Sequence, residues 1–171
     1  MHKSCTGEFK KVRVMEQLKR IASFSVDHDY ITEGIYVSRI DGDITTYDLR
    51  TRKPNCDDYM DHSTMHTLEH LFATYVRNSK MGERVIYFGP MGCQTGFYLL
   101  FRDADNGEVL SVVKDTLELI LKHEGEVPGA SRKECGNYMS LSLDKAKEEC
   151  RRYLENLLSR EQTFVYPKGD L

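Results

Sequence analysis

The segment His66-Thr67-Leu68-Glu69-His70 constrains this chain most, because it sets two imidazoles and a carboxylate within a helical pattern. Apolar residues recur at three-to-four spacing between residues 63 and 80, which predicts an amphipathic helix there. Residues four apart on a helix lie one above the other, so His66 and His70 can present both imidazoles to one ion. Glu69 lies on the same face, where a carboxylate beside a metal can accept a proton.

The alternative for this segment is a pair of solvent-exposed histidines. The flanking Leu68, Leu71 and Phe72 favour instead a face that is at least partly buried. A bound divalent ion requires a third protein ligand, and the residues alone leave that ligand open between Cys135, His62 and Cys93. A set of two histidines and one cysteine leaves a fourth position for substrate and suits iron(II), zinc or cobalt.

A second conspicuous segment is Gly89-Pro90-Met91-Gly92-Cys93-Gln94-Thr95-Gly96, in which three glycines and a proline surround one cysteine. This composition predicts a tight turn, centred on residues 89–92, with exposed backbone amides. A thiol beside such amides, or beside a metal, can serve as a base or a nucleophile. The alternative is a small buried cysteine in an ordinary hairpin, and the residues alone slightly favour it.

The remaining pattern predicts an α+β fold, a single-domain layer sandwich in which a mainly antiparallel sheet packs with helices. Strands are expected at residues 34–40, 44–51, 84–88 and 95–102, with Asp41-Gly42-Asp43 as a hairpin turn. Helices are expected at residues 11–20, 63–80, 108–123 and from Ser142 or Asp144 to Ser159, with Gly82 capping the second. Residues 52–61 and Pro128-Gly129 are expected to be loops. All 171 residues are assigned to one domain, with residues 1–20 as an N-terminal extension of unknown role.

Composition excludes several classes of function. The formal net charge is -3 and no basic stripe is present, so a nucleic-acid partner is not expected. The apolar runs are too short to span a membrane, and the N-terminus is charged, so a cytoplasmic protein without membrane contact is expected. The five cysteines are odd in number and widely spaced, which favours reduced thiols over a disulfide framework.

Taken together, the motifs resemble the S-ribosylhomocysteine lyase (LuxS) family, from about residue 20 to the C-terminus. The matching pieces, in the order of the family, are Ser23-Phe24, Asp27-His28, Tyr47-Asp48-Leu49-Arg50, Pro54-Asn55, His66-Thr67-Leu68-Glu69-His70, Gly89-Pro90-Met91-Gly92-Cys93-Gln94-Thr95-Gly96 and Glu134-Cys135-Gly136. Each motif alone is weak evidence, whereas the co-occurrence of HTLEH, PMGCQTG and a downstream Cys-Gly is specific.

The resemblance implies a role for each matching position. The implied ligands of one divalent ion per subunit, Fe(II) natively with Zn or Co as substitutes, are His66, His70 and Cys135. The implied acid-base pair is Glu69 and Cys93, and the implied substrate-pocket residues are Ser23, His28 and Arg50. The family works as a homodimer with sites at the interface. Tyr87 departs from the family, which often has Asp at the matching position.

The implied reaction is a metal-dependent isomerisation and β-elimination. It converts S-ribosylhomocysteine to homocysteine and 4,5-dihydroxy-2,3-pentanedione, the autoinducer-2 precursor of quorum sensing, within the methionine cycle. Two other classes stay open on the residues. The HxxEH string is typical of inverzincin metallopeptidases, which need a glutamate ligand such as Glu134 or Glu148. A structural zinc protein would have a closed site with His62 or Cys93 as fourth ligand.

Overall fold

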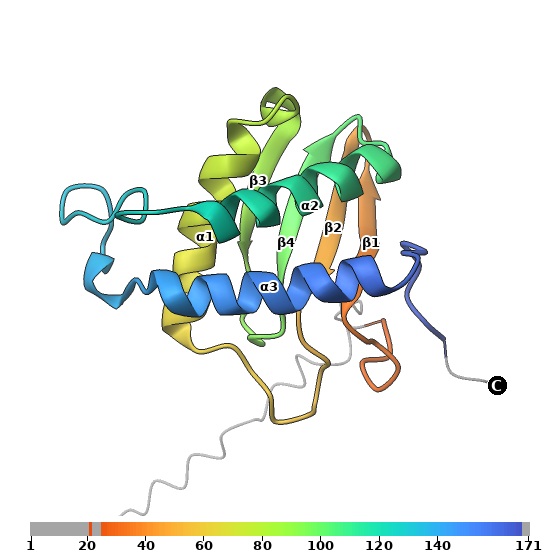
Figure 1. Cartoon of the computed structure of the whole chain (residues 1–171). Coiled ribbons are helices and arrows are strands. Elements are labelled where there is room, and N and C mark those ends of the chain that lie inside the picture. The colour runs from red at the N-terminus through yellow and green to blue at the C-terminus, as the bar shows by residue number, and fades with distance from the viewer. Residues whose placement is uncertain (1–20, 22–24, 169–171) are drawn as a thin grey trace, which may run out of the picture.

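The computed structural model describes residue 21 and residues 25–168 of the chain. Its centre is a four-stranded antiparallel sheet in the order β1-β2-β4-β3. The strands are β1 (Gly34–Asp41), β2 (Ile44–Arg50), β3 (Val85–Pro90) and β4 (Gly96–Arg102). The helices are α1 (His62–Arg77), α2 (Asn106–Lys122) and α3 (Leu143–Ser159), with short 3-10 turns η3 (Gly82–Arg84) and η4 (Tyr138–Ser140). In Figure 1, α2 and α3 run side by side across the sheet, which confirms the predicted α+β layer arrangement.

Alternation along the strands gives the sheet two different faces. Tyr47 and Leu49 of β2 point into the hydrophobic core formed with the helices, where they are 0% and 1% exposed. Asp48 and Arg50 therefore point to the opposite face. Ile40 and Tyr87 are large apolar or aromatic side chains that remain exposed on the sheet. Arg50, a predicted residue of the substrate pocket, thus lies with Asp48 on the face away from the main core.

The start of α1 is fixed by a cap and by an ion pair. Asp61 is the N-cap, and its carboxylate accepts a hydrogen bond from the Thr64 amide over 2.7 Å. Its second oxygen lies 2.6 Å from Nζ of Lys145 on α3. The Lys145 contact, together with the Thr64 amide, lowers the pKa of Asp61 to about 2. These contacts hold the first turn of the helix that carries the two histidines.

Three sequence expectations need correction or qualification. The second expected helix ends at Arg77 with Asn78 as its cap, so Gly82 is not the helix cap. Gly82 is needed because a Cβ there would lie 2.0 Å from the carbonyl oxygen of Arg77. β3 continues through Pro90, so the turn spans residues 91–95 and not residues 89–92. The helix expected at residues 11–20 lies outside the described residues.

The other expected elements are confirmed with small shifts. α2 begins at Asn106, two residues earlier than expected, because Asp105 caps it by accepting from the Glu108 amide. α3 begins after Ser142 and ends at Ser159, as expected. Among the described residues, no helix combines the length and the apolar character that a membrane crossing requires. The described cysteines, Cys56, Cys93, Cys135 and Cys150, are all free thiols.

Candidate metal centre and active site

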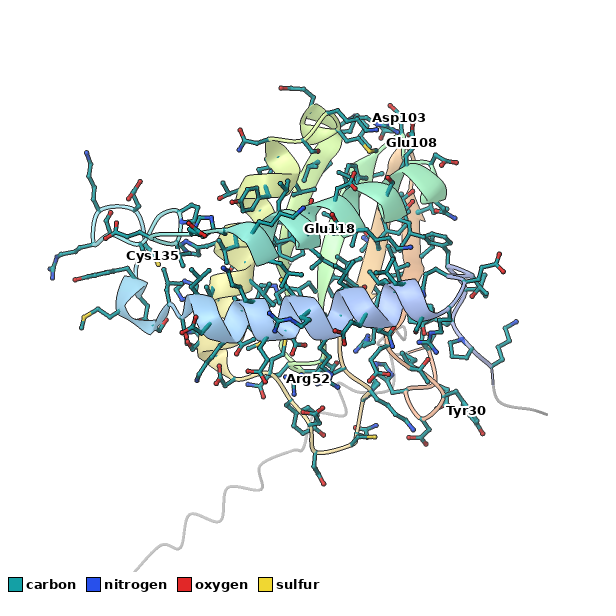
Figure 2. The ribbon with its side chains drawn as sticks, viewed as in Figure 1. Tyr30, Arg52, Asp103, Glu108, Glu118 and Cys135 are labelled. Carbon is teal, nitrogen blue, oxygen red and sulfur yellow. The ribbon has the colours of Figure 1, made fainter. Side chains whose placement is uncertain are left out.

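Three predicted ligands converge although they come from two distant parts of the chain. His66 and His70 lie one turn apart on α1, and their ring centroids are 4.8 Å apart. Cys135 lies on the loop between α2 and α3 (Figure 2). One ligand atom from each of the three lies within 4.8 Å of the others, and Cys135 Sγ is 3.3 Å from Nε2 of His66. These separations suit a single ion, whose bonds to nitrogen and sulfur are about 2.0–2.3 Å long.

The hydrogen bonds around His66 leave its Nε2 atom free to bind a metal. Nδ1 of His66 lies 2.8 Å from Oγ of Ser140. The Ser140 hydroxyl donates its hydrogen to the carbonyl oxygen of Asn137, so Nδ1 of His66 is the donor in their contact. The lone pair is then on Nε2, which faces Cys135. Burial lowers the pKa of His66, and His70 and His62 lower it further, which favours the neutral ring that metals bind.

His70 is oriented in the same way by a backbone carbonyl. Its Nδ1 donates to the carbonyl oxygen of Pro128 over 2.7 Å, because a carbonyl can only accept. Nε2 of His70 is therefore also a free ligand atom. The turn that supplies the carbonyl needs glycine at position 129 for two reasons. The backbone there has φ +76°, and a Cβ added there would lie 3.0 Å from His70 Nδ1.

The loop around Cys135 is shaped to present its sulfur. The Cys135 amide donates to the carbonyl of Ser131 over 2.9 Å, and the Asn137 amide donates to Cys135 Sγ over 3.4 Å. This backbone donor helps to fix the sulfur in place beside Nε2 of His66. The donor set of two neutral imidazoles and one thiolate fits Fe(II), Zn or Co.

The alternative ligands do not join this group. His62 is exposed, stacks on His66 with ring centroids 5.5 Å apart, and lies near Asn137. Across the described residues, the one group of potential ligands that converges contains neither His62 nor Cys93, and it contains no glutamate. The carboxylate of Glu134 instead accepts a hydrogen bond from Ser131 over 2.6 Å. The arrangement therefore favours an open three-ligand site over a closed zinc site or a peptidase site.

Glu69 is placed beside the ligands by helical geometry. It lies on α1 between His66 and His70 and is half-buried. Burial and the other two histidines lower the pKa of His66, and the Glu69 carboxylate raises it by a smaller amount. The helix thus brings a carboxylate, a group able to carry protons, close to the two histidines.

Cys93 lies exposed in the turn between β3 and β4. The Gln94 amide donates to the carbonyl of Met91 within the turn, and Gln94 has φ 64°. The Gln94 carbonyl accepts from the amide of Met60 over 3.0 Å, which ties the turn to the chain just before α1. Because the Cys93 side chain is exposed, the alternative of a small buried cysteine in a hairpin is wrong.

Two donors converge on the Cys93 sulfur. Oγ1 of Thr95 lies 3.1 Å away, and Nη1 of Arg50 lies 3.9 Å away. Arg50 Nη1 also donates to Thr95 Oγ1 over 2.5 Å, which leaves the Thr95 hydroxyl hydrogen available to the sulfur. Both the guanidinium and the hydroxyl are therefore placed to donate to the sulfur.

Arg50 is held by a buried partner. Its side chain is 3% exposed and that of Asp48 is 0% exposed, and the two form a bidentate pair with Nη2 2.5 Å from Oδ2. Burial acts to lower the pKa of Arg50, but the Asp48 carboxylate outweighs it, so the pKa is raised. Arg50 therefore remains a fixed cation beside Cys93.

Of the two remaining predicted pocket residues, the structure describes only His28. Ser23 lies outside the described residues. His28 is half-buried, and its Nδ1 donates to the carbonyl of Val26 over 3.1 Å. Tyr87 is 50% exposed on β3, and its hydroxyl reaches over Gly89, where a Cβ would lie 2.0 Å from it.

Sequence reasoning missed the residues that orient the site. Ser140 and Pro128 hold the two ligand histidines across gaps of 74 and 58 residues, which no local pattern reveals. Thr95 could have been predicted from the sequence, because it lies in the same glycine-rich segment as Cys93. A hydroxyl two residues from a candidate thiol is a signal that could have identified it.

Comparison with known proteins gives one consistent result. The profile of the family described as S-Ribosylhomocysteinase (LuxS) matches residues 21–164. An S-ribosylhomocysteine lyase of Clostridium beijerinckii is 40% identical over 158 residues, which cover 88% of this chain and 99% of the relative. Proteins of the same name from Finegoldia magna and Borreliella burgdorferi are 42% and 41% identical, each over 88% of this chain and 100% of the relative.

Proposed function

The chain belongs to the S-ribosylhomocysteinase (LuxS) family and is an S-ribosylhomocysteine lyase, and we propose from this premise how its side chains divide the reaction. The reaction converts S-ribosylhomocysteine to homocysteine and 4,5-dihydroxy-2,3-pentanedione. The proposed ligands of one divalent ion are His66, His70 and Cys135, and the proposed proton carriers are Glu69 and Cys93. The observation that carries this division is the convergence of the three ligand atoms within 4.8 Å.

The metal would have a limited and defined task. When bound, a divalent ion supplies Lewis-acid polarisation of the sugar oxygens and stabilises negative charge that develops on them. His66 and His70 would hold it through Nε2, because their Nδ1 atoms are engaged with Ser140 and Pro128. We propose Fe(II) as the native ion, with Zn or Co as substitutes, since all three accept this donor set.

Cys93 would move protons between neighbouring sugar carbons. Its thiolate would remove a proton beside the carbonyl and return it to the adjacent carbon, so the carbonyl shifts from the first to the third carbon in two such steps. The donors that surround the sulfur, Arg50 and Thr95, support this role because they stabilise the thiolate between transfers. Arg50 would also fix a charged or hydroxylated end of the substrate.

Glu69 would act closer to the leaving group. Removal of the proton next to the third-carbon carbonyl drives β-elimination, in which the carbon-sulfur bond breaks and homocysteine leaves as a thiolate. Glu69 supports this step from its place between the two ligand histidines on α1. It would also orient the substrate hydroxyls by hydrogen bonds.

We further propose a homodimer with the active sites at its interface. The sheet face that carries Arg50 also presents the exposed Tyr87, and β1 presents the exposed Ile40. Exposed apolar surface of this kind is common at subunit interfaces. Ser23 and His28 would then line a pocket completed by two subunits.

The proposed function also includes a cytoplasmic location for the enzyme and the use of its product as the precursor of a signal.

Thiol release from S-ribosylhomocysteine by the purified, iron-loaded or cobalt-loaded protein tests the proposed function. A colour reagent measures the free homocysteine, with and without a chelator. Release that stops on chelation and returns with metal is expected. Absence of release from the metal-loaded protein would contradict the function, and peptide hydrolysis would then be measured with the same preparation.

A further inference from the structure

The C-terminal segment after α3 reaches the Cys93 site through one side chain, Tyr166. The Tyr166 hydroxyl donates to Oδ2 of Asp48 over 2.8 Å, although 118 residues separate the two. The same Asp48 carboxylate accepts two hydrogen bonds from Arg50, at 3.1 Å and 2.5 Å. Arg50 Nη1 in turn lies 3.9 Å from Cys93 Sγ. A continuous chain of contacts therefore joins the C-terminal segment to the thiol.

Tyr166 is held in place independently of Asp48. Its ring stacks on Tyr36 of β1, with centroids 4.9 Å apart and planes 19° apart. The backbone upstream is anchored to the same strand, because the Val37 amide donates to the carbonyl of Phe164 over 2.8 Å. In Figure 1 this segment turns down beside β1. Tyr166 also lies beyond residues 21–164, which the family profile matches.

The hydroxyl matters because the Asp48-Arg50 pair is buried. A buried carboxylate stays stable only when its oxygens are well supplied with donors. Oδ2 of Asp48 has two donors, and one of them is Tyr166. Burial raises the pKa of Tyr166 and the Asp48 carboxylate raises it further, so the hydroxyl stays protonated and donates at neutral pH.

We propose that Tyr166 is a positioning residue for the lyase reaction, whose hydroxyl fixes Asp48 so that Asp48 holds Arg50 against Cys93. The hydrogen bond from the hydroxyl offsets part of the negative charge of Asp48. Asp48 then offsets less of the positive charge of Arg50, so Arg50 attracts a negatively charged Cys93 sulfur more strongly. The groups that face Cys93 are Arg50 from β2 and Tyr98 from β4, with Asp48 behind Arg50. The inference rests on the proposed function, because Tyr166 acts through the proton carrier Cys93.

The test compares Tyr166→Phe with Tyr36→Phe in the metal-loaded, full-length protein. Tyr166→Phe keeps the ring stack and removes the hydroxyl that contacts Asp48. Tyr36→Phe is the matched control, because its hydroxyl belongs to the same stacked pair but donates to the carbonyl of Thr32. Each variant is measured for kcat, for thermal midpoint, and for the pH profile of iodoacetamide alkylation at Cys93, followed by peptide mass spectrometry.

We expect Tyr166→Phe to lower kcat about ten-fold, the worth of one hydrogen bond to a charged group. We also expect it to move the midpoint of Cys93 alkylation to higher pH, while Tyr36→Phe leaves both at the wild-type values. An alkylation profile for Tyr166→Phe that matches the wild type overturns the inference, even if activity falls together with the thermal midpoint.

The two proposals fail in different ways. A wild-type protein that releases no homocysteine contradicts the proposed function. The alkylation profiles still test the link between Tyr166 and Cys93 in that case, because they need no substrate: a shift in Tyr166→Phe alone supports that link, and no shift overturns it.

Discussion

The Nδ1 atom of His70 donates to the carbonyl oxygen of Pro128 over 2.7 Å, and Gly129, which follows Pro128, places no side chain against the same ring. A Cβ at Gly129 would lie 3.0 Å from His70 Nδ1. Gly129→Ala should therefore displace the ring or the carbonyl and weaken metal binding about 10–100-fold, as loss of outer-shell support does. Metal affinity measured by competition with a chromogenic chelator checks this.

Gly125→Ala is the control for that substitution. Gly125 lies on the same loop with φ +89°, but a Cβ there meets no atom within 4 Å. It carries the backbone strain of a positive φ without the contact to His70. Equal loss of affinity in both variants would mean that loop strain, and not the His70 contact, controls the site.

Cys93→Ala should keep its metal and lose turnover. The three converging ligands do not include Cys93, whereas Arg50 and Thr95 both surround its sulfur. Loss of a general acid-base group lowers rate by about 10²–10⁴-fold. Metal content by elemental analysis and thiol release by colour assay measure the two effects. Cys56→Ala, which removes another exposed thiol, should match the wild type, and a Cys93→Ala protein with full turnover would refute the assignment.

These assignments show where sequence reasoning succeeds and where it stops. The pair His66 and His70 was predictable because helical spacing is local, and the glycines predicted a turn near Cys93, although its bounds were wrong because β3 continues through Pro90. Cys135 is 69 residues from His66, so spacing could not choose it over His62 or Cys93, and the family resemblance made that choice. The role of Gly82 was missed because its neighbour is the end of α1, whose position depends on packing.

Gly82→Ala should destabilise the fold without affecting the site directly. Its Cβ would lie 2.0 Å from the Arg77 carbonyl oxygen, so η3 or the end of α1 must move. Overpacking of this kind costs about 1–3 kcal/mol. Urea unfolding checks the value, with Gly92→Ala as the control because a Cβ there meets no atom within 4 Å. A free energy of unfolding equal to the wild type in Gly82→Ala would show that the close approach is absent in solution.

Asp61 should stabilise the protein in a defined pH window. Its pKa falls from 3.8 to about 2 in the folded chain, through the hydrogen bonds from Lys145 and the Thr64 amide. A lowered carboxyl pKa contributes stability that is present above pH 3.8 and is lost as pH falls towards 2. Asp61→Asn keeps a capping oxygen but loses the charge, so its deficit against the wild type should shrink across that window.

Asp61→Ala removes the cap as well and should cost about 1 kcal/mol more than Asp61→Asn, independently of pH. Thermal unfolding of the three proteins between about pH 5 and about pH 2 measures both effects, because this range spans the pKa of 3.8 and the lowered pKa of about 2. A deficit in Asp61→Asn that stays constant with pH would contradict the assigned cause of the shift.

The central claim is that Cys135, and not Cys93, binds the metal. The most direct measurement is the near-ultraviolet absorption of the cobalt-loaded protein, where a thiolate ligand produces a charge-transfer band. The account predicts that Cys93→Ser keeps this band at the wild-type intensity and that Cys135→Ser loses it. A band that survives in Cys135→Ser, or that disappears in Cys93→Ser, would contradict the assignment of the ligands.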